Sequence, residues 1–242
     1  MDNGATLPGN LDADFLKWTG IAAMTADHIG RFLLPDQIWL QVVGRLAFPL
    51  FAWSLVLGHH RTRDVGRYLL RLAILAVVAQ PVYSLLFPIT HHYGIQLNIV
   101  VSLALGLLAI HALHTERWGV LAGVIGVVVL PNISLQTVGR TPYVIDYGLR
   151  GLLLMLAMHL VIDKSILIRA CILGGILAFP WLHPTEPVIE FAERTIGLQG
   201  FAILSLPILL SPVQTRLPRA KWFFYIYYPA HLLVIWVVME AI

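Results

Sequence analysis

Residues 15–34, FLKWTGIAAMTADHIGRFLL, form an apolar segment that is long enough to cross a bilayer and carries three ionisable side chains in its second half. About 20 apolar residues in a helix span the hydrocarbon core. An isolated charge in hydrocarbon costs several kcal/mol, so such groups face a polar cavity or one another. Asp27 and Arg31 are four residues apart and His28 and Arg31 three apart, so all three can share one helix face. The segment predicts both a membrane helix and a polar site within it.

The composition extends this conclusion to the whole chain. Of its 242 residues, 58% are hydrophobic and 12% are charged, whereas a soluble domain has about 45–50% apolar and about 25% charged residues. We therefore predict a multi-pass membrane protein whose partner is the lipid bilayer. The net charge of +3 then concerns topology, and we predict no nucleic-acid partner.

The apolar runs predict an all-α transmembrane bundle of about nine helices, with eight to ten possible. The predicted ranges are 15–34, 38–58, 66–87, 95–113, 119–135, 142–162, 165–182, 196–211 and 222–242. The fifth and eighth are short and contain Pro131 and Pro207, so either could be broken or re-entrant. The whole chain, 1–242, is predicted to be one integral-membrane domain that begins with a polar arm at 1–14.

The basic residues predict the orientation of the bundle. If the N-terminus is cytoplasmic, the cytoplasmic loops hold most of the basic side chains near helix ends: Arg61, Arg63, Arg67, Arg117, Lys164, Arg169, Arg216, Arg219 and Lys221. The opposite loops hold chiefly Arg140 and Arg194. This asymmetry follows the positive-inside rule and predicts a cytoplasmic N-terminus and an external C-terminus.

In this orientation the polar residues of several helices lie in the outer half of the membrane. The second helix contributes Arg45, and the short connection to the first helix predicts that the two are antiparallel neighbours. We expect Arg31 and Arg45 to bind substrate. Other helices are expected to add substrate-binding residues at similar depth: Asn98, Asp146, Tyr147, Arg150 and His231. Two alternatives remain open. Asp146 and Arg150 can pair with each other, and His231 can serve as a helix–helix hydrogen-bonding group.

A second polar cluster follows the second helix. Arg61, Arg63 and Arg67 lie in the loop, and Arg71 stands one turn into the third helix. One interpretation is an anchor that touches anionic lipid headgroups. The other is a phosphate-binding patch, because arginine forks match phosphate oxygens bidentately.

The outer cluster has the residue types for proton transfer. The His28 imidazole titrates near neutrality and is our candidate for a general base. Asp27 could orient His28 or could instead pair with Arg31 or Arg45. Arg31, Arg45 or Asn98 could stabilise an oxyanion. Cys171 is the one cysteine and is predicted to be a small core residue. The ten histidines lack a closely spaced ligand set, so no metal is predicted.

Six stretches together resemble the TraX family. They are MTADHIG (24–30), GRLAFPLFAW (44–53), RTRDVGRYLLRLAILAVVAQPVY (61–83), LNIVVSLALG (97–106), DYGLRGLLL (146–154) and FFYIYYPAHLLV (223–234). The resemblance covers nearly the whole chain. It implies an inner-membrane acyltransferase, since the family is named for the F-pilin N-acetylase of conjugative plasmids.

The resemblance also implies the substrates. The acyl donor would be cytoplasmic acetyl-CoA, held by Arg61, Arg63, Arg67 and Arg71. The acceptor would lie at the periplasmic side and would be the N-terminal amine of a pilin subunit, with His28 and Asp27 as catalytic residues. A cell-envelope glycan or another small envelope acceptor is an alternative. A proton-coupled transporter is an alternative of another class, because such proteins also carry ionisable residues within helices.

Overall fold

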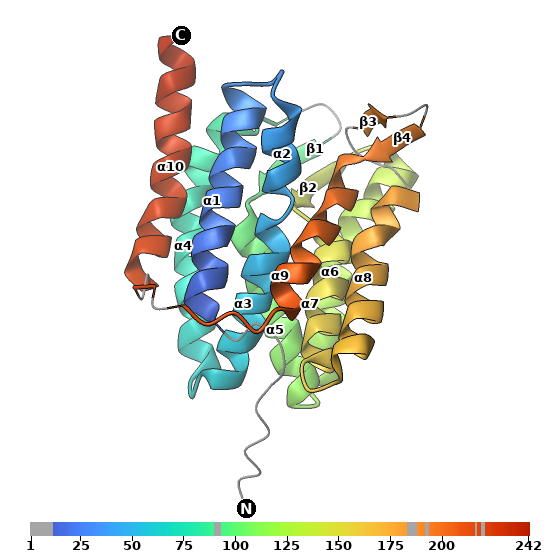
Figure 1. The fold of residues 1–242 in the computed structure, drawn as a ribbon. Helices are drawn as coiled ribbons and strands as arrows, with labels where there is room; N and C mark the ends of the chain where they lie inside the picture. Colours follow the sequence, from blue (N-terminus) through green and yellow to red (C-terminus); the bar gives the residue numbers. More distant parts are fainter. Residues whose placement is uncertain (1–11, 90–92, 183–187, 192–193, 216, 219–220) are drawn as a thin grey trace, which may run out of the picture. The chain divides into compact units, whose positions relative to one another are not determined.

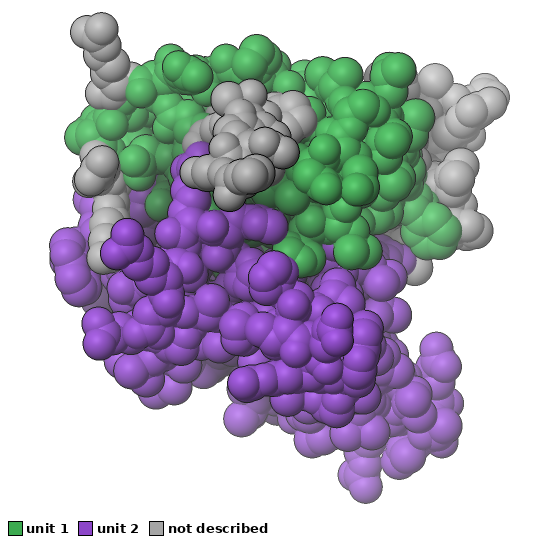
Figure 2. Space-filling model, turned by 90° about the horizontal axis from the view of Figure 1, so that it is seen from below, with its two compact units in different colours: residues 1–57, 157–220 green, residues 58–156, 221–242 purple. Residues whose placement is uncertain are grey.

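A computed structural model describes residues 12–89, 93–182, 188–191, 194–215, 217–218 and 221–242. Residues 1–11 of the predicted polar arm lie outside this set. The chain forms two compact units, shown in different colours in Figure 2: unit 1 comprises 1–57 and 157–220, and unit 2 comprises 58–156 and 221–242. Helices make up most of the described residues (Figure 1), which confirms the predicted all-α class.

Among the described residues, four helices are long and apolar enough to cross a membrane. They are Ile38–Arg61 (taken as one segment), Val65–Leu86, Trp118–Val138 and Trp222–Ala241. Shorter apolar helices accompany them at Ile99–His114, Gly148–Val161, Ile166–Pro180 and Leu198–Leu210. The chain is therefore a membrane protein, as its composition predicts.

Unit 1 is built around α1 (Ala13–Phe32) and α2 (Ile38–Gly44), which pack against each other. Helix α3 (Ala47–Arg61) follows, and its residues from Gly58 onward belong to unit 2. The unit continues with the end of α7 (Gly148–Val161), α8 (Ile166–Leu182), the hairpin of β3 (Val188–Phe191) and β4 (Arg194–Gly197), the 3₁₀ helix η1 (Leu198–Ser205) and α9 (Leu206–Leu210). Helix η1 packs on both α2 and α8.

Two glycines allow α1 and α2 to approach closely. A Cβ atom on Gly30 would lie 2.7 Å from Cβ of Leu40. A Cβ on Gly44 would lie 2.7 Å from Cγ of Asp27. Neither position can hold a larger residue without moving the helices, because real Cβ atoms do not come so near other heavy atoms. The predicted neighbouring arrangement of the first two helices is thus present.

The predicted second helix, 38–58, is present as the apolar segment Ile38–Arg61, but a turn at Arg45 divides it into α2 and α3. Residues 45 and 46 form a turn between α2 and α3. Pro49, four residues after Arg45, has no N–H to donate to the Arg45 carbonyl, and its ring crowds that carbonyl. Arg45 therefore stands at a helix end instead of within a regular helix.

Unit 2 contains α4 (Val65–Leu86), β1 (Tyr93–Leu97), α5 (Ile99–His114), α6 (Trp118–Val138), β2 (Thr141–Ile145), the larger part of α7, and α10 (Lys221–Ala241). Helix α4 packs against both α5 and α10, and α5 packs against α6. A buried cluster joins α5, α6, β2 and α7 through Ala109, Val124, Val128, Ile145 and Leu152. Of the two interrupted helices predicted from the sequence, α6 runs unbroken past Pro131, whereas the eighth changes from η1 to α9 beside Pro207.

Two short strands replace the predicted starts of two helices. Strands β1 and β2 pair in parallel, with Leu97 opposite Ile145. The helix predicted at 95–113 therefore begins at Ile99, and the helix predicted at 142–162 begins at Gly148. The strands end together, so Asn98 and Asp146 follow them at the same edge.

Candidate active site

Asp27 of α1, Arg45 at the end of α2 and Gln199 of η1 come together in unit 1. Nη2 of Arg45 lies 3.1 Å from Oδ1 of Asp27, and the two side chains are only 11% and 15% exposed. Nη1 of Arg45 donates a hydrogen bond to Oε1 of Gln199 at 3.3 Å. Of the alternatives that the sequence leaves open for Asp27, the structure shows the pairing with Arg45.

The Arg45 guanidinium keeps one further donor. Its Nε is buried and has no hydrogen-bond partner among the described residues. Oδ1 of Asp27 likewise accepts no aligned hydrogen bond there, so its contact with Arg45 is a charge pair. A buried N–H beside a fixed positive charge is suited to bind an oxygen on which negative charge develops.

Gln199 is a site residue that sequence reasoning missed. It stands at the second position of η1, 154 residues from Arg45 along the chain. An amide within the apolar run 196–211 was a signal, but nothing local indicates which residue it faces. The packing of η1 on α2 brings the two side chains together.

His28 and Arg31 belong to the same part of α1. Both are half-buried. The His28 ring lies 6.2 Å from the Phe32 ring, at an interplanar angle of 35°. Arg31 stands in the last turn of α1, where a cation interacts favourably with the helix dipole. The roles of His28 in catalysis and of Arg31 in substrate binding remain predictions.

Asn98, in unit 2, is fully buried and serves as the N-cap of α5. Its Oδ1 accepts from the backbone N–H of Val100 at 3.1 Å. Its Nδ2 donates to the carbonyl of Ala76 at 2.8 Å and to Oε1 of Gln80 at 2.9 Å. These bonds tie α5 to α4, so the amide already has partners within the protein.

Asp146 and Tyr147 form the turn that leads from β2 into α7, whereas the sequence predicted them within a helix. Oδ1 of Asp146 accepts from the backbone N–H of Tyr147 at 3.0 Å, and the Asp146 carbonyl accepts from the hydroxyl of Ser102. Tyr147 has a left-handed backbone with φ +58°, which is costly for a non-glycine residue. Arg150 is exposed in the first turn of α7.

His231 is buried in α10, with 7% of its surface exposed. Its Nδ1 lies 3.0 Å from the carbonyl oxygen of Tyr227, and its ring stacks on the Tyr227 ring at 5.1 Å. Because a carbonyl only accepts, Nδ1 carries the hydrogen, and in neutral His231 the lone pair lies on Nε2. The next residue in the same turn, Tyr228, has a buried hydroxyl with no hydrogen-bond partner among the described residues.

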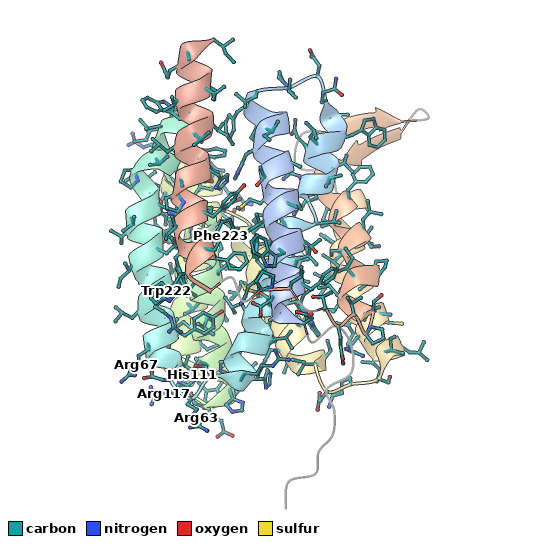
Figure 3. The ribbon with its side chains drawn as sticks, turned by 60° about the vertical axis from the view of Figure 1, so that its left-hand side comes forward. Arg63, Arg67, His111, Arg117, Trp222 and Phe223 are labelled. Atoms are coloured by element: carbon teal, nitrogen blue, oxygen red, sulfur yellow. The ribbon has the colours of Figure 1, made fainter. Side chains whose placement is uncertain are left out.

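The four arginines predicted to hold the donor all lie in unit 2, in different surroundings. Arg61 and Arg63 are exposed. Arg67 has an 82% exposed side chain and pairs with Asp64 at 2.9 Å. Arg71 is half-buried, with its guanidinium carbon 5.6 Å from the centre of the Tyr68 ring. In Figure 3, Arg63, Arg67, His111 and Arg117 lie toward one end of unit 2.

Histidines gather at the ends of α3 and α5, also in unit 2. The His59 ring lies 5.5 Å from that of His60, 5.8 Å from that of His111 and 5.6 Å from that of His114. Imidazoles in such numbers can bind a metal ion when neutral or an anion when protonated. The arginines nearby in the sequence favour an anion. The absence of a metal remains a prediction.

Two residues of α8 differ from their sequence-based interpretations. Arg169 of unit 1, treated as a loop charge, is only 1% exposed. Its position inside the apolar run 165–182 was the signal for this. Cys171, predicted to be a core residue, is exposed. It lies on the surface of the same helix because two residues rotate a helical side chain by about 200°.

The comparison with protein families matches residues 12–239 to the family described as "TraX protein". The chain belongs to the TraX family. The match runs from the N-cap of α1 almost to the end of α10, so it includes both units and every candidate site residue. It confirms the resemblance found in the sequence.

Three curated proteins give the breadth of this similarity. A probable fimbrial assembly protein, FimC of serogroup H1, from Dichelobacter nodosus is 28% identical over 223 residues, which cover 87% of this chain and 82% of FimC. Protein TraX from Escherichia coli K12 is 45% identical over 49 residues, which cover 19% of this chain and 20% of that protein. An uncharacterised protein, RP591, from Rickettsia prowazekii is 31% identical over 93 residues, or 38% of this chain and 34% of RP591. No solved structure matches the chain.

Proposed function

We propose that this protein is an acetyltransferase of the bacterial inner membrane. It moves an acetyl group from cytoplasmic acetyl-CoA to an acceptor at the periplasmic side, and the acceptor is the N-terminal amine of a pilin subunit. Membership of the TraX family and the fimbrial-assembly name of a relative support the pilin acceptor. The observation that carries the proposal is the buried Asp27–Arg45–Gln199 group, with His28 next to Asp27 on α1.

In the proposed reaction His28 removes a proton from the acceptor ammonium. The neutral amine attacks the thioester carbonyl carbon, and the carbonyl oxygen becomes an oxyanion. Once the C–N bond has formed, the oxyanion collapses, the C–S bond breaks, and CoA leaves as a thiolate. The thiolate takes up the proton that the attacking nitrogen releases as it becomes an amide, and the proton on His28 passes to solvent. The products are the acetylated amine and free CoA.

We base the proposed roles in unit 1 on the pairing of Asp27 with Arg45. Asp27 acts as a positioning residue that holds the Arg45 guanidinium, together with Gln199. The Nε–H of Arg45 then donates to the oxyanion. This arrangement leaves His28 to act as the base without Asp27 as its direct partner. Arg31 would bind the acceptor.

Unit 2 would bind the donor. Arg61, Arg63 and Arg67 present positive charge at the surface, where they attract the polyanionic CoA. Arg71 is the least exposed of the four. Asn98, Asp146, Tyr147, Arg150 and His231 are proposed to bind substrate within this unit.

The test is CoA release by the purified protein in detergent. We expect acetyl-CoA and a peptide with a mature pilin N-terminus to yield free thiol and a peptide heavier by one acetyl group. His28→Ala should lower the rate by about 10²–10⁴-fold, the usual contribution of a general base. Lys164→Ala, at an exposed residue in the turn after α7, is the control and should retain the rate.

The acceptors separate the alternatives. Thiol release with an envelope glycan and not with the peptide would support acetyltransferase activity but would show that the acceptor is a glycan and not a pilin. No thiol release with any acceptor would reject the enzyme and favour a transporter. A wild-type rate in a folded His28→Ala variant would remove His28 from the mechanism.

A further inference from the structure

Arg71 is a half-buried cation whose contacts in the described structure are aromatic. Its guanidinium lies over the Tyr68 ring, and the side chain of Tyr225 of α10 lies near it. No ion pair among the described residues includes Arg71. Its Nε is buried and has no hydrogen-bond partner among them. A cation in an apolar helix without a carboxylate is a costly arrangement unless an anion joins it.

Neighbouring elements of unit 2 hold this group in place. Helix α4 packs along α10, so residue 71 of one faces residue 225 of the other. Gly58 leaves room for Tyr68, since a Cβ there would lie 3.0 Å from the Tyr68 ring and 3.2 Å from its hydroxyl. The Trp222 ring lies 6.1 Å from the Tyr225 ring on α10. Figure 3 shows Trp222 near the start of that helix.

Arg71 and Tyr225 can each offer a hydrogen-bond donor to a ligand. Arginine has no acceptor, so Arg71 can only donate toward the Tyr225 oxygen. The phenol O–H therefore keeps its own hydrogen for another acceptor. The Nε–H of Arg71 is a second donor that has no hydrogen-bond partner among the described residues. Two donors and a positive charge match the oxygens of a phosphate group, and no carboxylate in the described part of the chain forms an ion pair with Arg71.

We propose that Arg71 and Tyr225 form a phosphate seat between α4 and α10, with Tyr68 supporting the guanidinium. The proposal rests on the proposed function in one respect, namely that the molecule whose phosphate binds here is acetyl-CoA. A lipid headgroup has the same phosphate chemistry. The exposed Arg61, Arg63 and Arg67 differ from the seat, because solvent screens them and Arg67 already has Asp64.

The first experiment measures CoA binding to the full chain in dodecyl maltoside, which contains no phosphate. A charge-assisted hydrogen bond contributes about 1.5–3 kcal/mol, which corresponds to roughly 10–150-fold in Kd. We expect Tyr225→Phe to weaken binding by about tenfold and Arg71→Met by at least as much. Tyr143→Phe, which removes a hydroxyl bonded to the Val127 carbonyl elsewhere in unit 2, is the matched control.

The second experiment replaces CoA with dioleoyl phosphatidic acid in mixed micelles. Loss of CoA binding in both seat variants assigns the seat to the donor. Loss of phosphatidic acid binding alone assigns it to a lipid. Unchanged binding of both ligands in a folded Tyr225→Phe variant overturns the seat, even if Arg71→Met misfolds. This result would reject the phosphate seat but not the proposed function. The function is tested separately, by release of CoA from the wild-type protein and its loss in His28→Ala.

Discussion

At the scale of single residues, the ion pair between Asp27 and Arg45 is the main energetic feature of unit 1. Both side chains are mostly removed from solvent, so each charge needs the other. Local sequence placed the carboxylate beside His28, but adjacent helical residues point about 100° apart. The partner that the structure supplies comes from the next helix. The structure thus pairs Asp27 with Arg45 and does not support Asp27 as the residue that orients the His28 ring.

Asp27→Asn tests this assignment. It leaves Arg45 as a largely buried cation without a counter-ion, and we expect a loss of about 1–3 kcal/mol in the free energy of unfolding, less than for a fully buried pair. The double variant Asp27→Asn, Arg45→Gln removes both charges and should be more stable than Asp27→Asn alone. Thermal unfolding in detergent measures both. Additive losses in the double variant would show that the two residues are not coupled.

At the scale of elements, the contact of α1 with α2 depends on small residues, and Gly44→Ala tests it. The new methyl would overlap Cβ, Oδ1 and Cγ of Asp27. We expect a loss of stability of about 1–3 kcal/mol and a fall in acetyl transfer, because the Asp27–Arg45 pair must move. Gly123→Ala in α6, where no atom lies within 4 Å of the added Cβ, should preserve both. Equal stability of the two variants would contradict the close packing.

The start of α1 carries a pH-sensitive contact outside the membrane-spanning segments. Partial desolvation alone would raise the pKa of Asp12. Hydrogen bonds from the backbone N–H of Phe15 and from Thr215 outweigh it, and the pKa lies below its usual value of 3.8. Oδ1 of Asp12 accepts from Phe15 at 2.9 Å, and Oδ2 accepts from the Thr215 amide and hydroxyl at 2.6 and 2.7 Å. The carboxylate thus joins the N-cap of α1 to the segment after α9.

This contact predicts a loss of stability in acid. A folded-state pKa below the unfolded value means that the stabilisation is fully present above the unfolded pKa. It is lost as pH falls through the folded pKa, so the change lies below about pH 5. Asp12→Asn should flatten the decline of the melting temperature between pH 5 and 3 relative to wild type. Identical pH profiles of the two proteins would show that the contact does not form in solution.

At the scale of the whole molecule, the apolar runs predicted the class, the number of helical segments and the neighbouring first two helices. Each depends on local hydrophobicity or on a short connection. The break at Arg45 was also available locally, since Pro49 stands four residues later. The strands could not be predicted from local sequence, because β1 and β2 pair residues that are 48 positions apart, such as Leu97 and Ile145.

The candidate site divides in the same way. Helical spacing groups Asp27, His28 and Arg31, and the short loop adds Arg45. Gln199 and Tyr225 join their arginines only through packing between distant helices. A lone polar residue in an apolar run therefore indicates that it has a partner, but single-sequence periodicity cannot say which.

The orientation of the chain in the membrane gives the last prediction. In unit 1, Gln37 lies in the exposed turn between α1 and α2, and Asp163 lies in the exposed turn between α7 and α8. Basic residues lie beside Asp163 and none lies beside Gln37. The positive-inside rule therefore places the Gln37 turn outside and the Asp163 turn inside. In a Cys171→Ser background, an impermeant maleimide should label Gln37→Cys in cells with a permeabilised outer membrane. Asp163→Cys should react only after lysis. The reverse pattern would put the N-terminus outside and move Asp27 and His28 to the cytoplasmic half, where a periplasmic acceptor cannot reach them.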